Sequence, residues 1–456
     1  MPLTRELSED ALLVFISDSH IGGDPGCDGF ESPEKLQALL EELGEHQGPV
    51  ELVLSGDFFD FLQISPPSPA TNRAAITLNR PEYQDMFEAL RCFAAGRQHR
   101  VIYMPGNHDA ESWWNSDIQD TLRESGFVDE FALSYLAFLG EDEKKFTIYC
   151  EHGNQFDPPN YIEDYAEPLD TPLGHHIVTD FTRKIAPIGE ISPGLDLSDV
   201  KNVYPVTDIP QWVASKYFYH LLGRSITYLM VPLILSYVAY RAVALYLSIS
   251  EDRSSSFFGS YLVLPRTHEA FLDVSFFVLI VLALLVMLFL LLRHRVRGFL
   301  SAGFASNSEE QEMVTKPEEV EALVKQNGPF PMLEGEEPSI DVFVSGHTHA
   351  PDLRGIERSD GSTVVMVNSG CWLRQLQPVG SYLRWPPVFA SKFVLTYVKV
   401  FVRDSKLCVE LWEYPKAATN HLTRTENLAA WGKMPDQPST NAKPRVVSAS
   451  EIPASS

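Results

Sequence analysis

Ten polar side chains stand where apolar runs of the sequence end, and their types suit the binding of divalent metal ions. The runs end in "SDSH", "GDFFD", "GNHD", "EHGN" and "GHTH". Carboxylate oxygens with several imidazoles, and no thiolate, are ligands for borderline cations such as Mn, Fe or Zn. Seven of the ten groups could fill two neighbouring metal sites. In chain order the ten are Asp18, His20, Asp57, Asp60, Asn107, His108, Asp109, His152, His347 and His349.

A single D-x-H pair would be weak evidence for a metal site. An Asp at a strand end often caps the next helix, and an isolated His is more often structural. Five such elements, each following an apolar run, are hard to explain by chance. The sequence therefore predicts a metal centre built from the ends of strands.

The first hundred residues predict the elements that position these side chains. Apolar runs at 12–16, 50–54 and 101–104 are typical of buried strands, and helical patterns over 33–43 and 83–93 separate them. This alternation implies parallel strands joined by right-handed crossovers. The loops after the carboxyl ends of such strands converge, so polar residues distant in sequence should meet in one crevice.

The strand and helix alternation resumes near residue 335. "PEEVEALVKQ" predicts a helix ahead of the strand "IDVFVSGHTH", and "STVVMVNSG" predicts a further strand. "KFVLTYVKVFVR" and "KLCVELWEY", joined at Asp404 and Ser405, predict a hairpin that helps to complete a second sheet. Residues 416–456 are polar, aperiodic and rich in Pro and Ser, so we expect a disordered tail.

Two apolar stretches interrupt the pattern within residues 161–335. They lie at about 225–248 and 271–292, and about 20 apolar residues are enough for a helix to cross a bilayer. Arg241 in the first stretch is tolerable near a helix end or in an interfacial helix, and a buried or interfacial hairpin is the alternative. Basic residues before the first stretch and after the second predict a multi-pass cell-membrane protein whose catalytic part faces the cytoplasm. These residues are Lys216, Arg224, Arg293, Arg295 and Arg297.

Composition excludes some classes of function. Lys and Arg number 36 against 61 Asp and Glu, and the net charge of −25 repels nucleic acids. The 45% hydrophobic content indicates a globular protein with a sizeable core. Five scattered cysteines without CxxC spacing favour neither a disulfide framework nor a zinc-thiolate site. Acidic residues ahead of the first apolar run, with no small-residue cleavage site, argue against a secretory signal.

The five motifs, in this order, resemble those of the calcineurin-like metallophosphoesterase family: D-x-H, G-D-x-x-D, G-N-H-D/E, a His before Gly, and G-H-x-H. The resemblance covers roughly residues 10–160 and 335–415. It implies an α/β fold, a four-layer αββα sandwich, with core halves at 1–160 and 336–415. The insertion at 161–335 would carry a transmembrane helical hairpin.

The resemblance also implies which residues bind two divalent cations, for which we expect Mn, with Fe or Zn as alternatives. Asp57 would bridge the two ions. A hydroxide bridging the cations would then attack phosphorus in line. The remaining ligands would be Asp18, His20 and His349 for the first ion, and Asn107, His152 and His347 for the second.

Other residues have roles that the sequence leaves more open. In the family scheme His108 is no ligand but faces the substrate, where it could protonate the leaving oxygen or stabilise charge, and Asp109 would orient its ring. Asp60 could stabilise its loop or support the metal centre. Asp157 should stabilise its turn, with orientation of His152 as the alternative.

Two further pairs rank lower as site candidates. Trp113 and Trp114 follow the His108 loop, where paired aromatics more often belong to the core or the rim than to a substrate pocket. His175 and His176 lie in the insertion, and we expect solvent to surround them.

The motif details favour some substrates over others. Ser/Thr protein phosphatases carry G-D-x-V-D-R-G and G-N-H-E, whereas this chain has "GDFFDF" and "GNHD", so a protein substrate is disfavoured. "EHGNQFD", "GHTHAP" and "NSGCW" look more like the UDP-2,3-diacylglucosamine pyrophosphohydrolase branch, which cleaves a lipid-linked nucleotide diphosphate, although that branch usually has Arg in place of His108. The resemblance therefore implies a lipid-linked phosphoester or pyrophosphate. The alternatives are a phosphodiesterase for soluble nucleotides and a non-catalytic metal-binding scaffold. The oligomeric state stays open.

Overall fold

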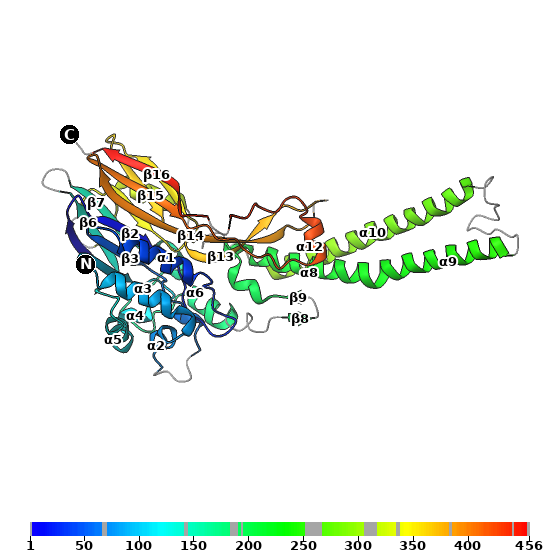
Figure 1. The fold of residues 1–456 in the computed structure, drawn as a ribbon, viewed down its shortest axis with the longest axis horizontal. Helices are drawn as coiled ribbons and strands as arrows, with labels where there is room; N and C mark the ends of the chain where they lie inside the picture. The colour runs from blue at the N-terminus through cyan, green and yellow to red at the C-terminus, as the bar shows by residue number, and fades with distance from the viewer. Residues whose placement is uncertain are drawn as a thin grey trace.

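Two β-sheets form the body of the molecule, and two long helices project from it (Figure 1). The computed structural model describes residues 2–65, 71–140, 145–182, 190–192, 195–250, 267–304, 317–333, 338–382, 385–439 and 442–453.

The larger sheet has eight strands in the order β16-β15-β14-β2-β3-β4-β5, with β13 paired to β14. Its strands β2, β3 and β4 are parallel, as the alternating pattern predicted, and β5 is parallel to β4. Strand β14 joins β2 in antiparallel fashion, so the hairpin of β14 and β15 extends this sheet and the expectation that it completes a second sheet is wrong. The bounds are β2 Leu12–Ile16, β3 Val50–Ser55, β4 His99–Met104, β5 Glu130–Phe131, β13 Trp372–Val379, β14 Val388–Arg403, β15 Lys406–Glu413 and β16 Arg445–Pro453.

The smaller sheet has six strands in the order β1-β6-β7-β10-β12-β11. Its central strands β7, β10 and β12 are parallel to one another. The bounds are β1 Leu3–Leu7, β6 Ser134–Leu139, β7 Phe146–Glu151, β10 Val342–Ser345, β11 Asp352–Glu357 and β12 Thr363–Asn368; a separate pair comprises β8 Glu190–Ser192 and β9 Leu195–Asp196.

Strand β2 shows how the layers are held together. Its side chains alternate, so Leu13 and Phe15 enter the core between the two sheets, whereas Val14 and Ile16 pack against the helices. Helices α1 and α3 cover this outer face, while α11 packs on the outer face of the smaller sheet. The order of layers is therefore helix, sheet, sheet, helix, as expected. The bounds are α1 Pro33–Gly44, α2 Arg73–Leu78, α3 Gln84–Ala94, α4 Glu111–Trp114, α5 Ser116–Glu124, α6 Leu173–His176 and α11 Pro317–Gln326.

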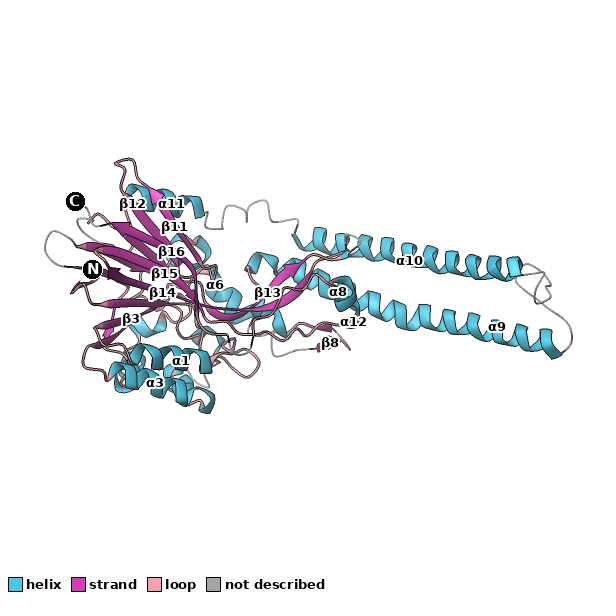
Figure 2. Ribbon diagram, turned by 45° about the horizontal axis from the view of Figure 1, so that its top comes forward, coloured by secondary structure: helices cyan, strands magenta, loops and turns pink. Residues whose placement is uncertain are grey.

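A continuous helical run leads out of the body. It comprises α8 Ile209–Ser225, a π-helical turn at Ile226–Met230 and α9 Val231–Ser250, and α10 Thr267–Phe304 returns beside it (Figure 2). Among the described residues, one helix, Ile209–Val243, is long and apolar enough to cross a membrane, and the apolar helix Phe271–Met287 is shorter. One such helix does not establish the expected transmembrane hairpin, and the expected cytoplasmic orientation stays a prediction.

Specific contacts join α9 to α10. The guanidinium of Arg241 lies 2.7 Å from the buried Asp273 carboxylate. The rings of Tyr237 and Phe277 stack with centroids 3.8 Å apart. These contacts hold the two helices at one register, and the ion pair neutralises the charge of Arg241.

The base of the run is fixed to the body. Buried residues of α8 pack against Val388 at the start of β14 and against α12 Arg424–Ala429. The Tyr219 hydroxyl donates to the Pro386 carbonyl at 2.7 Å, and Lys216 pairs with the buried Glu426 at 3.1 Å. The base of the run is therefore packed and hydrogen-bonded to the body.

The structure corrects the expectation of a disordered tail at 416–456. Thr423 and Glu426 form a capping box that begins α12. Strand β16 pairs with β15 through main-chain hydrogen bonds along the sheet edge. Only Ile452 of that strand is buried, so its sequence lacks the apolar alternation that reveals a strand.

Candidate metal centre

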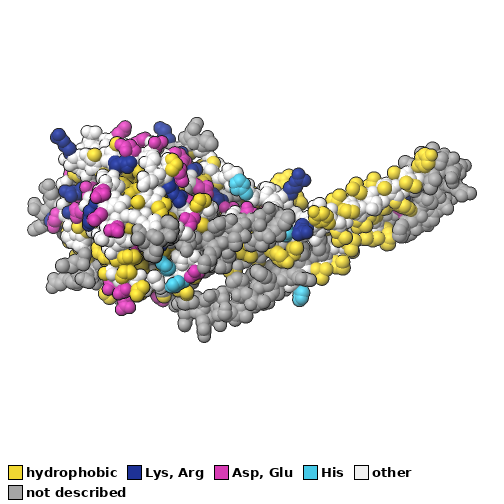
Figure 3. All heavy atoms as spheres, turned by 90° about the horizontal axis from the view of Figure 1, so that it is seen from below, with side chains coloured by type: hydrophobic (Ala, Val, Ile, Leu, Met, Phe, Trp, Pro, Cys, Tyr) yellow, Lys and Arg dark blue, Asp and Glu magenta, His cyan; other side chains and the backbone are white. Residues whose placement is uncertain are grey.

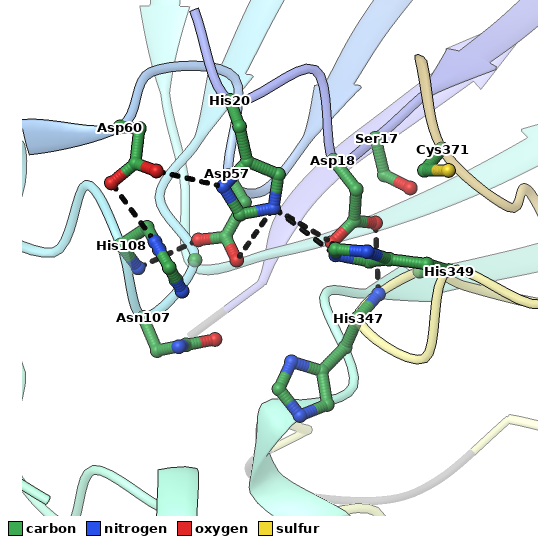
Figure 4. Close-up of polar contacts among 12 residues, drawn as sticks. Ser17, Asp18, His20, Asp57, Asp60, Asn107, His108, His347, His349 and Cys371 are labelled. Atoms are coloured by element: carbon green, nitrogen blue, oxygen red, sulfur yellow. Dashed lines mark hydrogen bonds and ion pairs between the residues drawn. The ribbon is translucent and has the colours of Figure 1, made fainter. Parts of the chain in front are cut away.

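The loops that carry the five motifs open at one edge of the two sheets. Strands β2, β3 and β4 are adjacent and parallel in the larger sheet, and β7 and β10 are adjacent and parallel in the smaller one. Their carboxyl ends meet, and Asp18, His20, Asp57, His108 and His349 turn toward one another (Figure 4).

A first group consists of Asp18, His20 and His349, whose ligand atoms lie within 4.8 Å of one another. The Nε2 atom of His349 lies 3.2 Å from Asp18 Oδ1 and 3.1 Å from His20 Nε2 (Figure 4). Two imidazole nitrogens that face each other beside a carboxylate are arranged to share one cation.

A second group consists of Asp57, His152 and His347, also within 4.8 Å of one another. Asp57 Oδ2 lies 3.3 Å from His152 Nε2 and 3.8 Å from His20 Nε2, so this carboxylate faces both groups. Asp57 therefore stands where a bridging ligand would.

Unpaired atoms test whether the centre fits cations. Asp18 Oδ1, Asn107 Oδ1 and His152 Nε2 are buried, and none has a hydrogen-bond partner in the described part of the chain. A buried polar atom left unpaired costs about 1–3 kcal/mol. Each belongs to a residue that the resemblance assigns as a ligand, so the donor set fits divalent cations.

The backbone supports the same assignment. Eight residues other than glycine have a positive φ in the described part of the chain, and five of them are candidate ligands. A residue in this sparsely populated region costs about 1–3 kcal/mol, and such residues cluster at functional sites. The five are Asp18, His20, Asp57, His347 and His349, with φ between 48° and 64°.

Two glycines of the motifs make room for the candidate ligands His152 and Asp57. A side chain at Gly56 would overlap the His152 ring, and one at Gly106 would overlap the Asp57 carboxylate and the His152 ring. The close approach of the backbone therefore explains why glycine occupies both positions.

The second nitrogens of two candidate ligand rings have acceptors nearby. His152 Nδ1 lies 3.0 Å from the Ser55 carbonyl, which leaves Nε2 for a cation. His347 Nε2 lies 2.9 Å from Asp157 Oδ2. The alternative in which Asp157 orients His152 is therefore wrong, because Asp157 orients His347.

A residue that the sequence did not single out connects two candidate ligands. The Asn160 side chain donates to Asp157 Oδ2 at 2.6 Å and accepts from the Asn107 side chain at 3.4 Å. These contacts join the His347 loop of one sheet to the Asn107 loop of the other. No pattern in "DPPN" indicates this role.

The position of Asp109 corrects another expectation. Its carboxylate accepts from the Gly106 N–H at 2.7 Å and from the Tyr103 hydroxyl at 2.5 Å, so it braces the loop instead of orienting His108. Asp60 Oδ1 lies 3.0 Å from His108 Nδ1 and also accepts from the Gln63 N–H. Asp60 thus stabilises its loop, while its support of the metal centre and any catalytic role of Asp109 stay predictions.

Mutual electrostatics set the charges at the centre. Burial opposes ionisation of Asp57 and Asp60, but the neighbouring histidines outweigh it, holding the pKa of Asp57 well below its usual value and lowering that of Asp60 to about 2. Burial likewise opposes protonation of His108, yet Asp60 and Asp57 raise its pKa to about 9. Burial lowers the pKa of His349 by more than Asp18 raises it, which favours the neutral ring that binds cations.

The lower-ranked candidates lie outside these groups. Trp114 in α4 is 39% exposed and Trp113 is half-buried, as expected of residues at a rim. The side chain of His176 is 56% exposed, in agreement with the expected solvation, and His175 is half-buried.

Residues 11–219 match the family model described as Calcineurin-like phosphoesterase. This part of the chain is therefore similar to a calcineurin-like phosphoesterase domain, which supports a phosphoesterase hydrolase. The "GHTH" motif at 346–349 lies beyond the matched residues, and the fold returns it to the same centre. No curated protein matches the chain.

Two solved structures show a distant likeness. Vacuolar Protein Sorting 29 from Cryptosporidium parvum is 12% identical, with 97% of this chain and 98% of that chain covered and a TM-score of 0.31. A single mutant of Vps29 from Entamoeba histolytica is 9% identical, with 88% and 92% covered and a TM-score of 0.24. At these scores neither likeness bears on the fold or the function.

Proposed function

We propose that the chain is a two-cation phosphoester hydrolase that acts on a membrane-associated, lipid-linked phosphodiester or pyrophosphate. The observation that carries the hydrolytic part is the convergence of carboxylate and imidazole atoms around Asp57, several of them buried without a hydrogen bond in the described residues. The lipid-linked part rests on the apolar helices and on the motif resemblance.

The two groups would each hold one divalent cation, and Asp57 would contact both. The other ligands would be Asp18, His20 and His349 at one ion, and Asn107, His152 and His347 at the other. When bound, the cations would polarise phosphoryl oxygens and supply a nucleophilic water at neutral pH.

His108 would act on the substrate. Its Nδ1 faces Asp60, so Nε2 is left to meet a phosphoryl or leaving oxygen. The Asp60 carboxylate raises the pKa of His108, which favours the protonated ring, so the ring can donate a proton to the leaving oxygen or stabilise its charge.

Membrane attachment is supported by the surface of the projecting helices. Figure 3 shows hydrophobic side chains along both, whereas acidic and basic side chains gather on the body. The 20 residues of α9 extend about 30 Å, close to the thickness of the hydrocarbon layer. Exposed apolar residues on the two helices include Leu235, Val238, Val243, Phe271, Leu279, Leu282 and Val286.

A membrane-held active site gains local concentration for an amphiphilic substrate. The rigid joint at α8 would keep the metal centre at a fixed place relative to the bilayer. We propose that α9 and α10 enter the bilayer together and that the body lies on the cytoplasmic side, as the flanking basic residues predict.

The experiment compares substrates on the detergent-purified, Mn-supplemented chain. A chromogenic phosphodiester, a phosphomonoester, a cyclic nucleotide and a lipid-linked nucleotide diphosphate are tested beside Asp57→Asn. We expect the lipid-linked substrate to be hydrolysed fastest, and the variant to be inactive on all four.

The other outcomes separate the alternatives. A preference for the cyclic nucleotide would replace the lipid-linked proposal with a soluble-nucleotide phosphodiesterase. No turnover of any substrate by a protein that binds two Mn ions would favour the scaffold.

A further inference from the structure

Residues 199–204, here called the bracing segment, connect the base of the helical run to the metal centre. Val203 forms a bridge with Leu376 of β13, and Val200, Val203, Leu376 and Trp212 of α8 share one buried cluster. The segment is therefore packed on the body and on the first turns of α8 together.

The bracing segment also contacts the loop that follows His20. Lys201 Nζ donates to the Gly26 carbonyl at 3.0 Å. Asp199 pairs with Arg374 of β13 at 2.7 Å, and Arg374 pairs in turn with Glu31 at 2.8 Å. Through these contacts the bracing segment holds the stretch of chain that follows Asp18 and His20.

Tyr204, at the end of the segment, reaches the other loop of the same cation site. Its ring stacks on the His349 ring, with centroids 4.5 Å apart and planes 15° apart. Its hydroxyl donates to the Thr348 carbonyl, and Gln375 of β13 donates to the His349 carbonyl at 3.0 Å.

His349 needs such support. Its backbone has φ 51°, a conformation that persists only where surrounding contacts hold it. Its Nδ1 is buried and has no hydrogen-bond partner among the described residues, so no acceptor fixes this ring in the way that Ser55 fixes His152. The Tyr204 ring supplies the orientation that a hydrogen bond supplies elsewhere.

We propose that Tyr204 is a positioning residue for His349, and that the bracing segment makes the first cation site and the base of α8 one rigid unit. The inference rests on the proposed function, because it takes His349 as a cation ligand. It assigns the insertion a part in metal binding, separate from anchoring.

The test measures Mn binding by the full chain in detergent, without reference to turnover. Tyr204→Leu removes the ring, and Tyr204→Phe keeps the stack but loses the bond to Thr348. Tyr382→Leu is the matched control, because Tyr382 is 51% exposed and outside the described contacts of the centre. Thermal unfolding in chelator identifies any variant that fails to fold.

We expect Tyr204→Leu to lower the affinity for one of the two Mn ions by about 10–100-fold, the usual effect of losing a residue that supports a metal ligand. The other ion should bind as in the wild type, so the electron paramagnetic resonance signal of the coupled Mn pair should vanish at limiting Mn. The Mn affinity of Tyr204→Phe should lie between those of Tyr204→Leu and the wild type, and the affinity of Tyr382→Leu should equal that of the wild type.

Equal affinity for both ions in Tyr204→Leu and wild type would overturn the role of Tyr204 and leave the proposed function standing. An equal loss of affinity for both ions would also overturn the role of Tyr204, because its ring contacts a candidate ligand of one site only. A wild type that fails to bind two ions would overturn the proposed function itself, and this inference with it.

Discussion

The metal-centre loops and the projecting helices both depart from the usual arrangement, in which polar groups are exposed and apolar groups are buried. The loops bury polar atoms, and the helices expose apolar side chains. In the loops, polar atoms such as Asp18 Oδ1 and His152 Nε2 are buried without hydrogen-bond partners in the described residues. On the helices, apolar side chains such as Leu235 and Leu279 are more than half exposed, while the charges of Arg241 and Asp273 are paired.

Each arrangement indicates the environment that would satisfy it. Buried oxygens and nitrogens that converge need a cation, and exposed apolar helices with neutralised charges need an apolar medium. The same reasoning supports a metal centre at the loops and a membrane contact at the projecting helices. The predictions below test the two regions separately.

The largest effect should come from Asp57→Asn. The amide cannot bridge two cations as a carboxylate does, so turnover should fall by more than the roughly 100-fold that loss of an outer partner costs. Metal analysis should show fewer than two ions per chain. Asp120→Asn, at a side chain that is 69% exposed, is the matched control and should behave as wild type. Full activity in Asp57→Asn would contradict the bridging role.

His108→Ala should lower the catalytic rate by about 10²–10⁴-fold, the usual worth of a general acid. The metal content should not change, because His108 is outside both groups of proposed ligands. His176→Ala removes an exposed imidazole and serves as control. Loss of metal from the His108 variant would mean that this ring is a ligand.

Asp60→Asn should shift the pH dependence of turnover. The carboxylate is the neighbour that raises the pKa of His108 most, so protonated His108 should persist to higher pH in the wild type than in the variant. Without the carboxylate the pKa falls, and the alkaline loss of activity should move to lower pH. An unchanged pH profile would show that His108 does not act as the acid.

Arg241→Met should lower the thermal midpoint of the protein in detergent micelles. The change leaves Asp273 without its basic partner, at a cost on the order of 1 kcal/mol for a polar contact between apolar helices. The double variant with Asp273→Leu removes both charges and should recover most of the loss. A single variant as stable as wild type would show that the pair does not hold α9 to α10.

The sequence predicted the elements and side chains whose signals are local. Strand β2 is a run of buried residues that ends at Ile16, shortly before Asp18, and the hairpin of β14 and β15 turns at Asp404 and Ser405, both of positive φ. Motif order also pointed to the carboxylate and imidazole groups that the fold brings together, and their role as ligands stays a prediction.

Other features had no local signal. Strand β16 is held by main-chain bonds at a sheet edge, so its side chains show no apolar alternation. The pairing of His108 with Asp60 rather than Asp109 depends on how two loops pack, and Tyr204 approaches His349 from the insertion. Contacts of this kind depend on tertiary structure and cannot be derived from residue spacing.

The central claim is that two cations at this centre carry out phosphoester hydrolysis. The most direct test removes metal from the wild-type chain with chelator, returns Mn stepwise, and follows bound Mn and turnover in the same samples. We predict no turnover in the chelated protein and a rate that reaches its maximum at two ions per chain. Turnover by the metal-free protein, or a maximum at one ion, would contradict the account.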